Sequence, residues 1–338
     1  RIIPDVLREY GYVSAQASSN WVAYTGGIDA RFDVDMNPTV LGQTQEEVMD
    51  KQIVEEVIPT LIAQLPASET FVHYQLQTPH FPYCTEEVDT VVDGFDMCVD
   101  TDVSEEELAQ IWSAFNAAYN LDPDGFIGRM HSIYEQQVRE TDVLIGQIVS
   151  QYEEAGRNPV FIVTGDHGEE FFEHGNLFHG EDLHVEQVHV PLIMWGPGIP
   201  SGRVVEGPVS TTDIFPTILS MAEVRSEGSQ LIGRNLRSLM RREDVDGPYR
   251  ALYESFVYDE ETSSIWFSNG ITATLPDEEE PWSLIEREFK GDALLYNQEA
   301  DPGQVSNLAE IEPEILEIMS SLNTPSQWGD WRDDWNSQ

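Results

Sequence analysis

The stretch that most constrains the fold of this chain is a short apolar run, VFIVT, at positions 160–164. It shows no alternation of polar and apolar residues, so the strand that it predicts must be covered on both faces. Strands of this kind occur in parallel sheets that lie between layers of helices. Further strands are predicted at 12–18, 70–76 and 189–198, and helices are predicted at 2–11, 44–65, 129–155 and 210–222.

This alternation of strands and helices predicts an α/β fold with a mixed, mostly parallel sheet. From about residue 225 the pattern changes to short runs that predict a small antiparallel sheet, followed by one more helix. We therefore expect an α/β domain over residues 1–225 and a small α+β subdomain over 226–338. The acidic segment 85–125, with a short helix near 104–119, is interpreted as an insertion in the first domain.

The chain is strongly acidic. Its 62 Asp and Glu residues against 17 Lys and Arg give a formal net charge of −45, and only two of the bases are lysines. The acids are dispersed, so we interpret them as a solvated surface suited to high salt, where ions screen self-repulsion. Attraction to a cationic partner is the alternative. Nucleic acid is excluded as a partner, because its phosphates would be repelled.

Cysteine usage, the lengths of apolar runs and the first residue give weaker indications of where the protein is located. Cys84 and Cys98 could form one disulfide bond or none, and there is no CxxC metal motif. No apolar run reaches the length of a transmembrane helix, so no membrane segment is predicted. The chain begins with Arg inside a predicted helix, so we expect it to be a fragment from which any signal peptide has been lost. A cytoplasmic location is favoured, with secretion left open.

Side chains able to bind a metal follow the apolar run directly. Asp166 and His167 stand in a turn flanked by glycines, where the predicted strand ends. Open α/β sheets bind ligands at the carboxyl ends of their strands. A carboxylate oxygen and an imidazole nitrogen together suit a divalent cation. The pair therefore predicts part of a metal site.

Two more histidines, His174 and His179, lie in the loop that follows, each before a glycine. A single surface histidine most often has only a structural role. Four candidate groups behind one buried strand favour a functional site instead. His184 and His189 are expected to be structural.

The stretches TGDHGEEFFEHG and HVPLIMWGPG resemble the sulfatase branch of the alkaline-phosphatase superfamily. That branch carries Ser-Asp-His/Asn-Gly, then a Lys or His, and later Val-Pro-Leu-Ile before a Gly-Pro-Gly turn. The resemblance implies an alkaline-phosphatase-like fold and metal-dependent hydrolysis of a small sulfated substrate. Further stretches agree with the family in the same order: VLREYGYVSA, FVHYQLQTPHFPY, YEQQVRETDVLIGQIV, STTDIFPTIL and LLYNQEADPGQVSNLAE.

Carried over position by position, the resemblance implies a role for each candidate residue. Asp166 and His167 would bind the metal, usually Ca²⁺ in sulfatases and Mn²⁺ or Zn²⁺ in relatives that process phosphate. His80 would contact the sulfate and protonate the leaving oxygen, and His179 would hold the sulfate oxygens. His174 matches a position that is histidine in some relatives, and it joins His80 and His179 as a candidate catalytic residue.

The chemistry of sulfate ester hydrolysis explains why metal-binding and proton-donating residues would be needed. Hydrolysis of a sulfate ester develops negative charge on the transferring group and on the leaving oxygen. A divalent cation and cationic side chains stabilise the first, and a general acid neutralises the second. Asp213 matches a motif aspartate of the family, and for it we favour a role as a helix cap.

The sequence also departs from the family. The family nucleophile lies in Cys/Ser-x-Pro/Ala-x-Arg, where Cys or Ser is converted to formylglycine, and neither Cys84 nor Cys98 stands in such a motif. We expect that this segment and the family's first Asp-Asp metal ligands preceded residue 1, and that the chain alone has negligible activity. Two alternatives stay open: a phosphodiesterase or phospho-group transferase of the same superfamily, and a catalytically inactive anion-binding module.

Overall fold

The computed structural model describes residues 2–19, 31–36, 50–85, 87–99, 103–180, 182–225, 233–241, 250–259, 264–275, 278, 280–288 and 290–323. The chain divides into two compact units, Arg1–Pro159 and Val160–Gln338. The boundary predicted near residue 225 lies within the second unit and stays a prediction. Among the helices of these ranges, none combines the length and apolar composition needed to cross a bilayer.

The first unit is built on a parallel sheet of three strands in the order β2–β1–β3. The strands are β1 (Val13–Ser18), β2 (Val34–Met36) and β3 (Thr70–Gln75), and both pairings are parallel. Ala15 and Ala17 of the central strand are fully buried. Ser14 and Gln16, which alternate with them and face the other side of the sheet, are almost completely buried as well. Burial on both faces is what a covered parallel sheet requires, and the predicted α/β class is confirmed.

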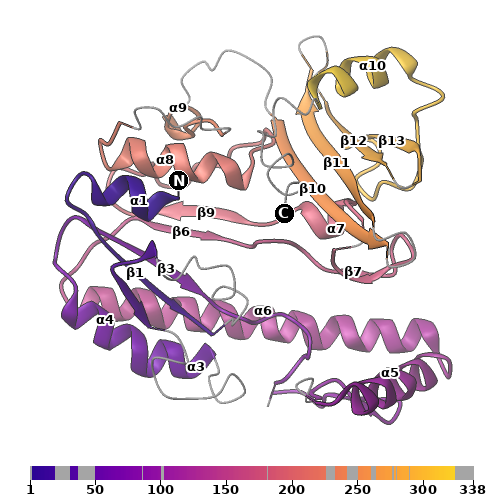
Figure 1. Cartoon of the computed structure of the whole chain (residues 1–338), viewed down its shortest axis with the longest axis horizontal. Helices are drawn as coiled ribbons and strands as arrows, with labels where there is room; N and C mark the ends of the chain where they lie inside the picture. The colour runs from indigo at the N-terminus through magenta and orange to yellow at the C-terminus, as the bar shows by residue number, and fades with distance from the viewer. Residues whose placement is uncertain are drawn as a thin grey trace. The chain divides into compact units, whose positions relative to one another are not determined.

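Helices of this unit flank the sheet (Figure 1). α1 (Ile3–Arg8) leads into β1, and a helical segment leads into β3. That segment consists of α3 (Asp50–Gln52), a π-helical turn (Ile53–Val57) and α4 (Ile58–Gln64). Pro59 was expected to interrupt a helix here. It lies instead in the first turn of α4, directly after the π-helical turn, and residues 44–49 of the predicted helix lie outside the described ranges.

A disulfide bond between Cys84 and Cys98 closes the start of the acidic segment 85–125. Between these cysteines the chain forms the hairpin of β4 (Val91–Val92) and β5 (Phe95–Asp96). The sequence left open whether these two cysteines form a disulfide bond, and in the structure they do.

Two helices complete this unit. α5 (Glu105–Tyr119) begins at a capping box in which Ser104 and Glu107 satisfy each other's backbone N–H. α6 (Pro123–Glu154) begins before the predicted residue 129, because Asp122 accepts from the Gly125 N–H and Pro123 suits a first helical position.

The second unit opens with the strands β6 (Phe161–Thr164) and β9 (Leu192–Trp195). The chain between them forms the hairpin of β7 (Glu170–Phe171) and β8 (Leu177–Phe178) and the short helix α7 (Val185–Val188). After β9 come a 3-10 turn (Thr211–Asp213), α8 (Ile214–Met221) and α9 (Arg237–Arg241).

The pairing of β6 differs from the expectation. Within the described residues, β6 pairs with β9 and the pair is antiparallel, with Phe161 opposite Trp195 and Thr164 opposite Leu192. A continuous apolar run indicates a strand and its environment, but it contains no information on the direction of the neighbouring strand. The prediction of a parallel neighbour for residues 160–164 was therefore wrong for this pair.

The predicted antiparallel sheet near the end of the chain is confirmed. Its strands follow one another as a meander: β10 (Arg250–Asp259), β11 (Ser264–Thr274), β12 (Pro281–Arg287) and β13 (Asp292–Asn297). α10 (Pro313–Leu322) packs on the sheet through Met319, which joins a buried cluster with Ile271, Leu284 and Leu295.

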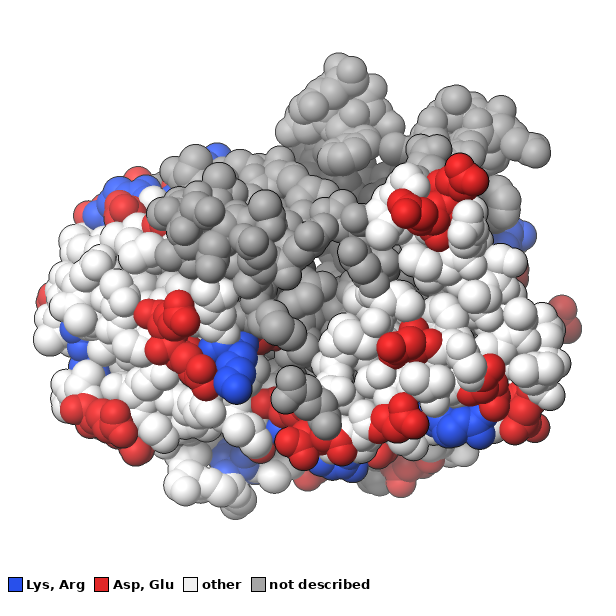
Figure 2. Space-filling view, turned by 90° about the horizontal axis from the view of Figure 1, so that it is seen from below, with Lys and Arg blue, Asp and Glu red and all other residues white. Residues whose placement is uncertain are grey.

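The charged side chains on the surface reflect the acidic composition of the chain. Figure 2 shows acidic side chains in several separate groups on the visible face, with fewer basic side chains between them. This distribution agrees with dispersed charge, and adaptation to high salt stays a prediction.

Candidate functional site

The turn after β6 is fixed by the backbone of Gly168. Its N–H donates to the carbonyl oxygen of Gln187 at 2.7 Å. A Cβ atom at position 168 would lie 2.0 Å from the carbonyl oxygen of Glu186, so no other residue fits without moving the main chain. This close approach to α7 holds the preceding residues, Asp166 and His167, in place.

Asp166 and His167 present one oxygen donor and one nitrogen donor. The Asp166 carboxylate is largely exposed and accepts the His167 N–H at 3.0 Å. The His167 Nδ1 lies 2.9 Å from the Gly168 carbonyl oxygen. Since a carbonyl can only accept, Nδ1 carries a proton, and the lone pair of the neutral ring is on Nε2. That Nε2 lies 3.8 Å from Asp166 Oδ1.

The sequence implies a divalent metal at this donor set. The tautomer of His167 and the exposed carboxylate of Asp166 suit two ligands of one cation. Among the described residues, however, no group of three or more His, Cys, Asp and Glu side chains is arranged to hold a metal ion. Asp166 and His167 supply two suitable donors, and a metal site built on them stays a prediction.

His179 lies directly against this pair. The imidazole rings of His179 and His167 stack with their centroids 3.8 Å apart. His179 Nδ1 donates to the Glu169 carboxylate at 2.8 Å, and only 5% of the Glu169 side chain is exposed. The structure thus brings together three of the predicted site residues, Asp166, His167 and His179, and adds Glu169, which sequence reasoning missed.

The loop that carries His179 is organised by a second missed carboxylate, Glu170. This residue is fully buried. It accepts the backbone N–H groups of His174 and Asn176 at 3.1 and 2.8 Å, and the side-chain amide of Gln187 at 2.7 Å. Three donors compensate the buried charge. Glu169 and Glu170 thus have different partners, the first holding the His179 ring and the second holding the backbone of the loop.

His174 belongs to a different cluster from His179. Its ring stacks on His184 with centroids 3.7 Å apart. Its Nε2 donates to the carbonyl oxygens of Gly303 and Gln304 at 3.1 and 3.2 Å, and its Nδ1 lies 3.1 Å from the Glu186 carboxylate. These contacts tie the loop to the turn after β13. A catalytic role for His174 stays a prediction.

The environment of His184 agrees with the structural role expected for it. The residue is 4% exposed, and burial lowers the pKa of its imidazole to about 4, against the opposing effect of the Asp182 carboxylate. Asp213 also has the role expected for it. It accepts the Ser210 N–H at 3.0 Å in a capping box and forms an ion pair with Arg234.

His80 stands in the first unit, in the loop after β3. Its side chain is exposed, its N–H donates to the Gln77 carbonyl oxygen at 3.0 Å, and its Nδ1 donates to the Phe81 carbonyl oxygen. The loop is anchored by the buried carboxylate of Asp50, which accepts the N–H groups of Gln77 and Thr78, each at 2.8 Å. Asp50 was another residue that the sequence did not single out.

Comparison with known proteins identifies the family. Residues 1–224 match the family model "Sulfatase". The chain belongs to the sulfatase family. Arylsulfatase K of Danio rerio is 28% identical over 205 residues, which cover 58% of this chain and 37% of that protein. The matched part therefore spans little more than a third of the length of this sulfatase relative.

Solved sulfatase structures have the same fold. A 2-O GAG sulfatase aligns with a TM-score of 0.65 and 16% identity, covering 98% of this chain and 76% of that chain. A second structure, in complex with its substrate D-glucosamine-2-N,6-O-disulfate, aligns with a TM-score of 0.64 and 16% identity, covering 97% of this chain and 81% of that chain. At this identity the likeness confirms the alkaline-phosphatase-like fold alone.

Proposed function

We propose that this protein takes part in the hydrolysis of sulfate esters, with residues 166–179 as one side of the site that receives the sulfuryl group. The observation that carries the proposal is the stacking of His179, held by Glu169, against the candidate metal ligand His167. Membership of the sulfatase family supports it. The small sulfated sugar bound by one structural relative makes a sulfated sugar a reasonable first substrate class.

Within this proposal, Asp166 and His167 are the residues that would hold a divalent cation. Such a cation would supply a positive charge beside the sulfuryl oxygens, and Ca²⁺ is the first candidate, with Mn²⁺ or Zn²⁺ if the substrate is a phosphate ester. Formylglycine is the nucleophile that the family implies, and it is proposed to lie outside residues 1–338. His179 would hold the sulfuryl oxygens through its ring, which Glu169 orients.

His80 is proposed to give its proton to the leaving oxygen. Its contact with the Phe81 carbonyl oxygen places one proton on Nδ1, so protonation of Nε2 would make the ring a cationic general acid. Any role of His174 would act through the loop 172–178, which it anchors to the turn after β13.

The phosphate-ester alternative has one observation in its favour, since His167 stands where sulfatases often have Asn. The test uses the protein translated from the complete reading frame, assayed with 4-nitrophenyl sulfate and with 4-nitrophenyl phosphate at matched concentrations. We expect kcat/KM to favour the sulfate ester, and His80→Gln to slow esters with poor leaving groups more than the nitrophenyl ester. A preference for the phosphate ester would replace the proposal by the alternative, and no turnover of either ester would favour the anion-binding module.

A further inference from the structure

A pocket of about 80 Å³ lies in the second unit, away from the candidate site. Val160 and Gly198 line it, just before β6 and just after β9. Because β6 and β9 are antiparallel, with Phe161 opposite Trp195, these residues mark one end of the strand pair. Asp166 lies beyond the other end, where Thr164 pairs with Leu192. The pocket is therefore separate from the residues assigned to sulfate chemistry.

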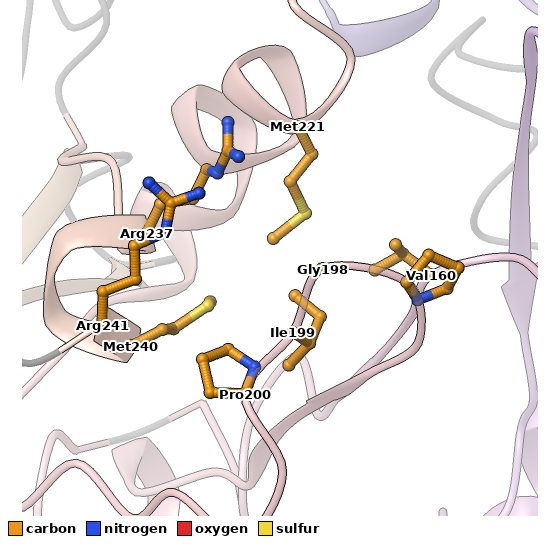
Figure 3. Close-up of a pocket in the computed structure, with 9 residues that line it drawn as sticks. Val160, Gly198, Ile199, Pro200, Met221, Arg237, Met240 and Arg241 are labelled. Atoms are coloured by element: carbon orange, nitrogen blue, oxygen red, sulfur yellow. The ribbon is translucent and has the colours of Figure 1, made fainter.

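The walls of the pocket are apolar and adaptable. Met221 reaches it from the end of α8, Met240 from α9, and Ile199 from the turn after β9 (Figure 3). Methionine side chains are flexible and polarisable, so they can adjust to apolar groups of different shapes. The volume is that of only a few water molecules in the liquid, which limits an occupant to a short chain.

Two cationic side chains, Arg237 and Arg241, line the same pocket from α9. Arg237 Nη1 donates to the Ser220 carbonyl oxygen at 2.7 Å and lies 3.3 Å from the Ser220 hydroxyl, so its guanidinium is held at the wall. Within the part of the chain that the structure describes, neither arginine forms an ion pair with a carboxylate. This is unusual in a chain with 62 acidic and only 17 basic residues.

Like charges four residues apart on a helix repel each other. An anion placed between the two guanidinium groups would relieve that repulsion, and planar guanidinium groups suit the two oxygens of a carboxylate. We propose that this pocket binds a short-chain alkyl carboxylate, with its head group at Arg237 and Arg241 and its chain against Met221 and Met240. The inference is independent of the proposed sulfate chemistry.

The test uses the full chain labelled with ¹³C at its methionine methyl groups and titrated with pentanoate. We expect the Met221 and Met240 signals to shift and saturate. The signals of Met97 and Met130, which are fully buried in the first unit, should stay in place and report an intact fold. Pentan-1-ol, which lacks the charge, and pentylammonium, which reverses it, should give no saturable shift.

Arg241→Gln is the decisive variant, because the Arg241 side chain has no hydrogen bond or ion pair within the described residues whose loss would disturb the fold. It should weaken pentanoate binding by at least about tenfold, whereas Arg225→Gln, beyond the end of α8 and outside the pocket lining, should leave it unchanged. No saturable shift, an equal response to pentan-1-ol, or equal binding by Arg241→Gln would overturn the proposal. Inorganic sulfate that binds as tightly as pentanoate would overturn the role given to the methionines.

Discussion

The imidazole rings of His167 and His179 stack with their centroids 3.8 Å apart and 29° between their planes. One ring belongs to the candidate metal ligand next to Asp166, and the other is held by the Glu169 carboxylate. The contact places the residue proposed to bind a cation beside the residue proposed to bind sulfuryl oxygens. The turn at Gly168 and the hairpin of β7 and β8 are the parts of the fold that bring them together.

Glu169 is expected to act as a positioning residue for His179. Glu169→Gln keeps the shape of the side chain but removes the charge that fixes the ring and its tautomer. We expect kcat for a sulfate ester to fall about 10–100-fold with KM little changed, and the pH dependence of kcat to shift. The matched control is Glu135→Gln on the exposed face of α6. A wild-type pH profile in Glu169→Gln would contradict the assignment.

Gly168→Ala should disrupt the turn, because the added Cβ would lie 2.0 Å from the Glu186 carbonyl oxygen. We expect a loss of about 1–3 kcal/mol in the free energy of unfolding, measured by urea denaturation. Gly146→Ala is the control, since a Cβ at that position in α6 meets no atom within 4 Å apart from its chain neighbours and the helix's own backbone. It should stabilise the protein by about 0.5–1 kcal/mol. Equal effects of the two substitutions would show that the close approach at Gly168 is not formed.

The disulfide bond between Cys84 and Cys98 closes a loop with a sequence separation of 14. A loop of this size is expected to stabilise the folded chain by about 3 kcal/mol, mainly by restricting the unfolded state. The double substitution of both cysteines by Ser should lower the urea midpoint by a corresponding amount. A reducing agent should lower the midpoint of the wild type and leave the variant unchanged. If the wild type is also insensitive to the reductant, the bridge does not form in solution.

Burial lowers the pKa of His184 from about 6.5 to about 4. The folded protein keeps this ring neutral, whereas the unfolded chain protonates it near pH 6.5. Its contribution to stability is therefore complete above pH 6.5 and is lost as the pH falls toward 4. The full effect is on the order of 3 kcal/mol.

The matched variant is His184→Phe, which keeps an aromatic ring against His174 but cannot titrate. The free energy of unfolding, measured by urea denaturation at pH 7, 5.5 and 4.5, should fall more steeply for the wild type than for the variant. Parallel pH dependences would rule out a strongly lowered pKa at this position.

Much of the fold could be predicted from the sequence because its signals are local. The short strand-like run 12–18, the apolar run 160–164 and the helical spacing of 129–155 each indicate one element. The direction of pairing could not be predicted in the same way. β6 and β9 are antiparallel because of how the chain returns through residues 165–191, and no residue type within β6 specifies that path.

The residues of the candidate site likewise divide into those that the sequence indicates and those that only the structure shows. Asp166, His167 and His179 could be named from their order along the chain, and the structure places them in one cluster. Glu169 and Glu170 could not be named from the sequence, because two neighbouring acids do not stand out in a chain with 62 Asp and Glu residues. Their roles show only in the structure, where one holds His179 and the other anchors the loop. His174 lies in the same loop as His179 and matches a family position that is histidine in some relatives, yet its ring stacks on His184 instead.

The most direct test of the central claim compares Asp166→Asn with Asp142→Asn, an aspartate on α6, in the protein translated from the complete reading frame. The measurement is kcat/KM for 4-nitrophenyl sulfate with Ca²⁺ present. If residues 166–179 receive the sulfuryl group, Asp166→Asn should lose at least about 100-fold while Asp142→Asn keeps wild-type activity. Equal activity of the two variants would contradict the account.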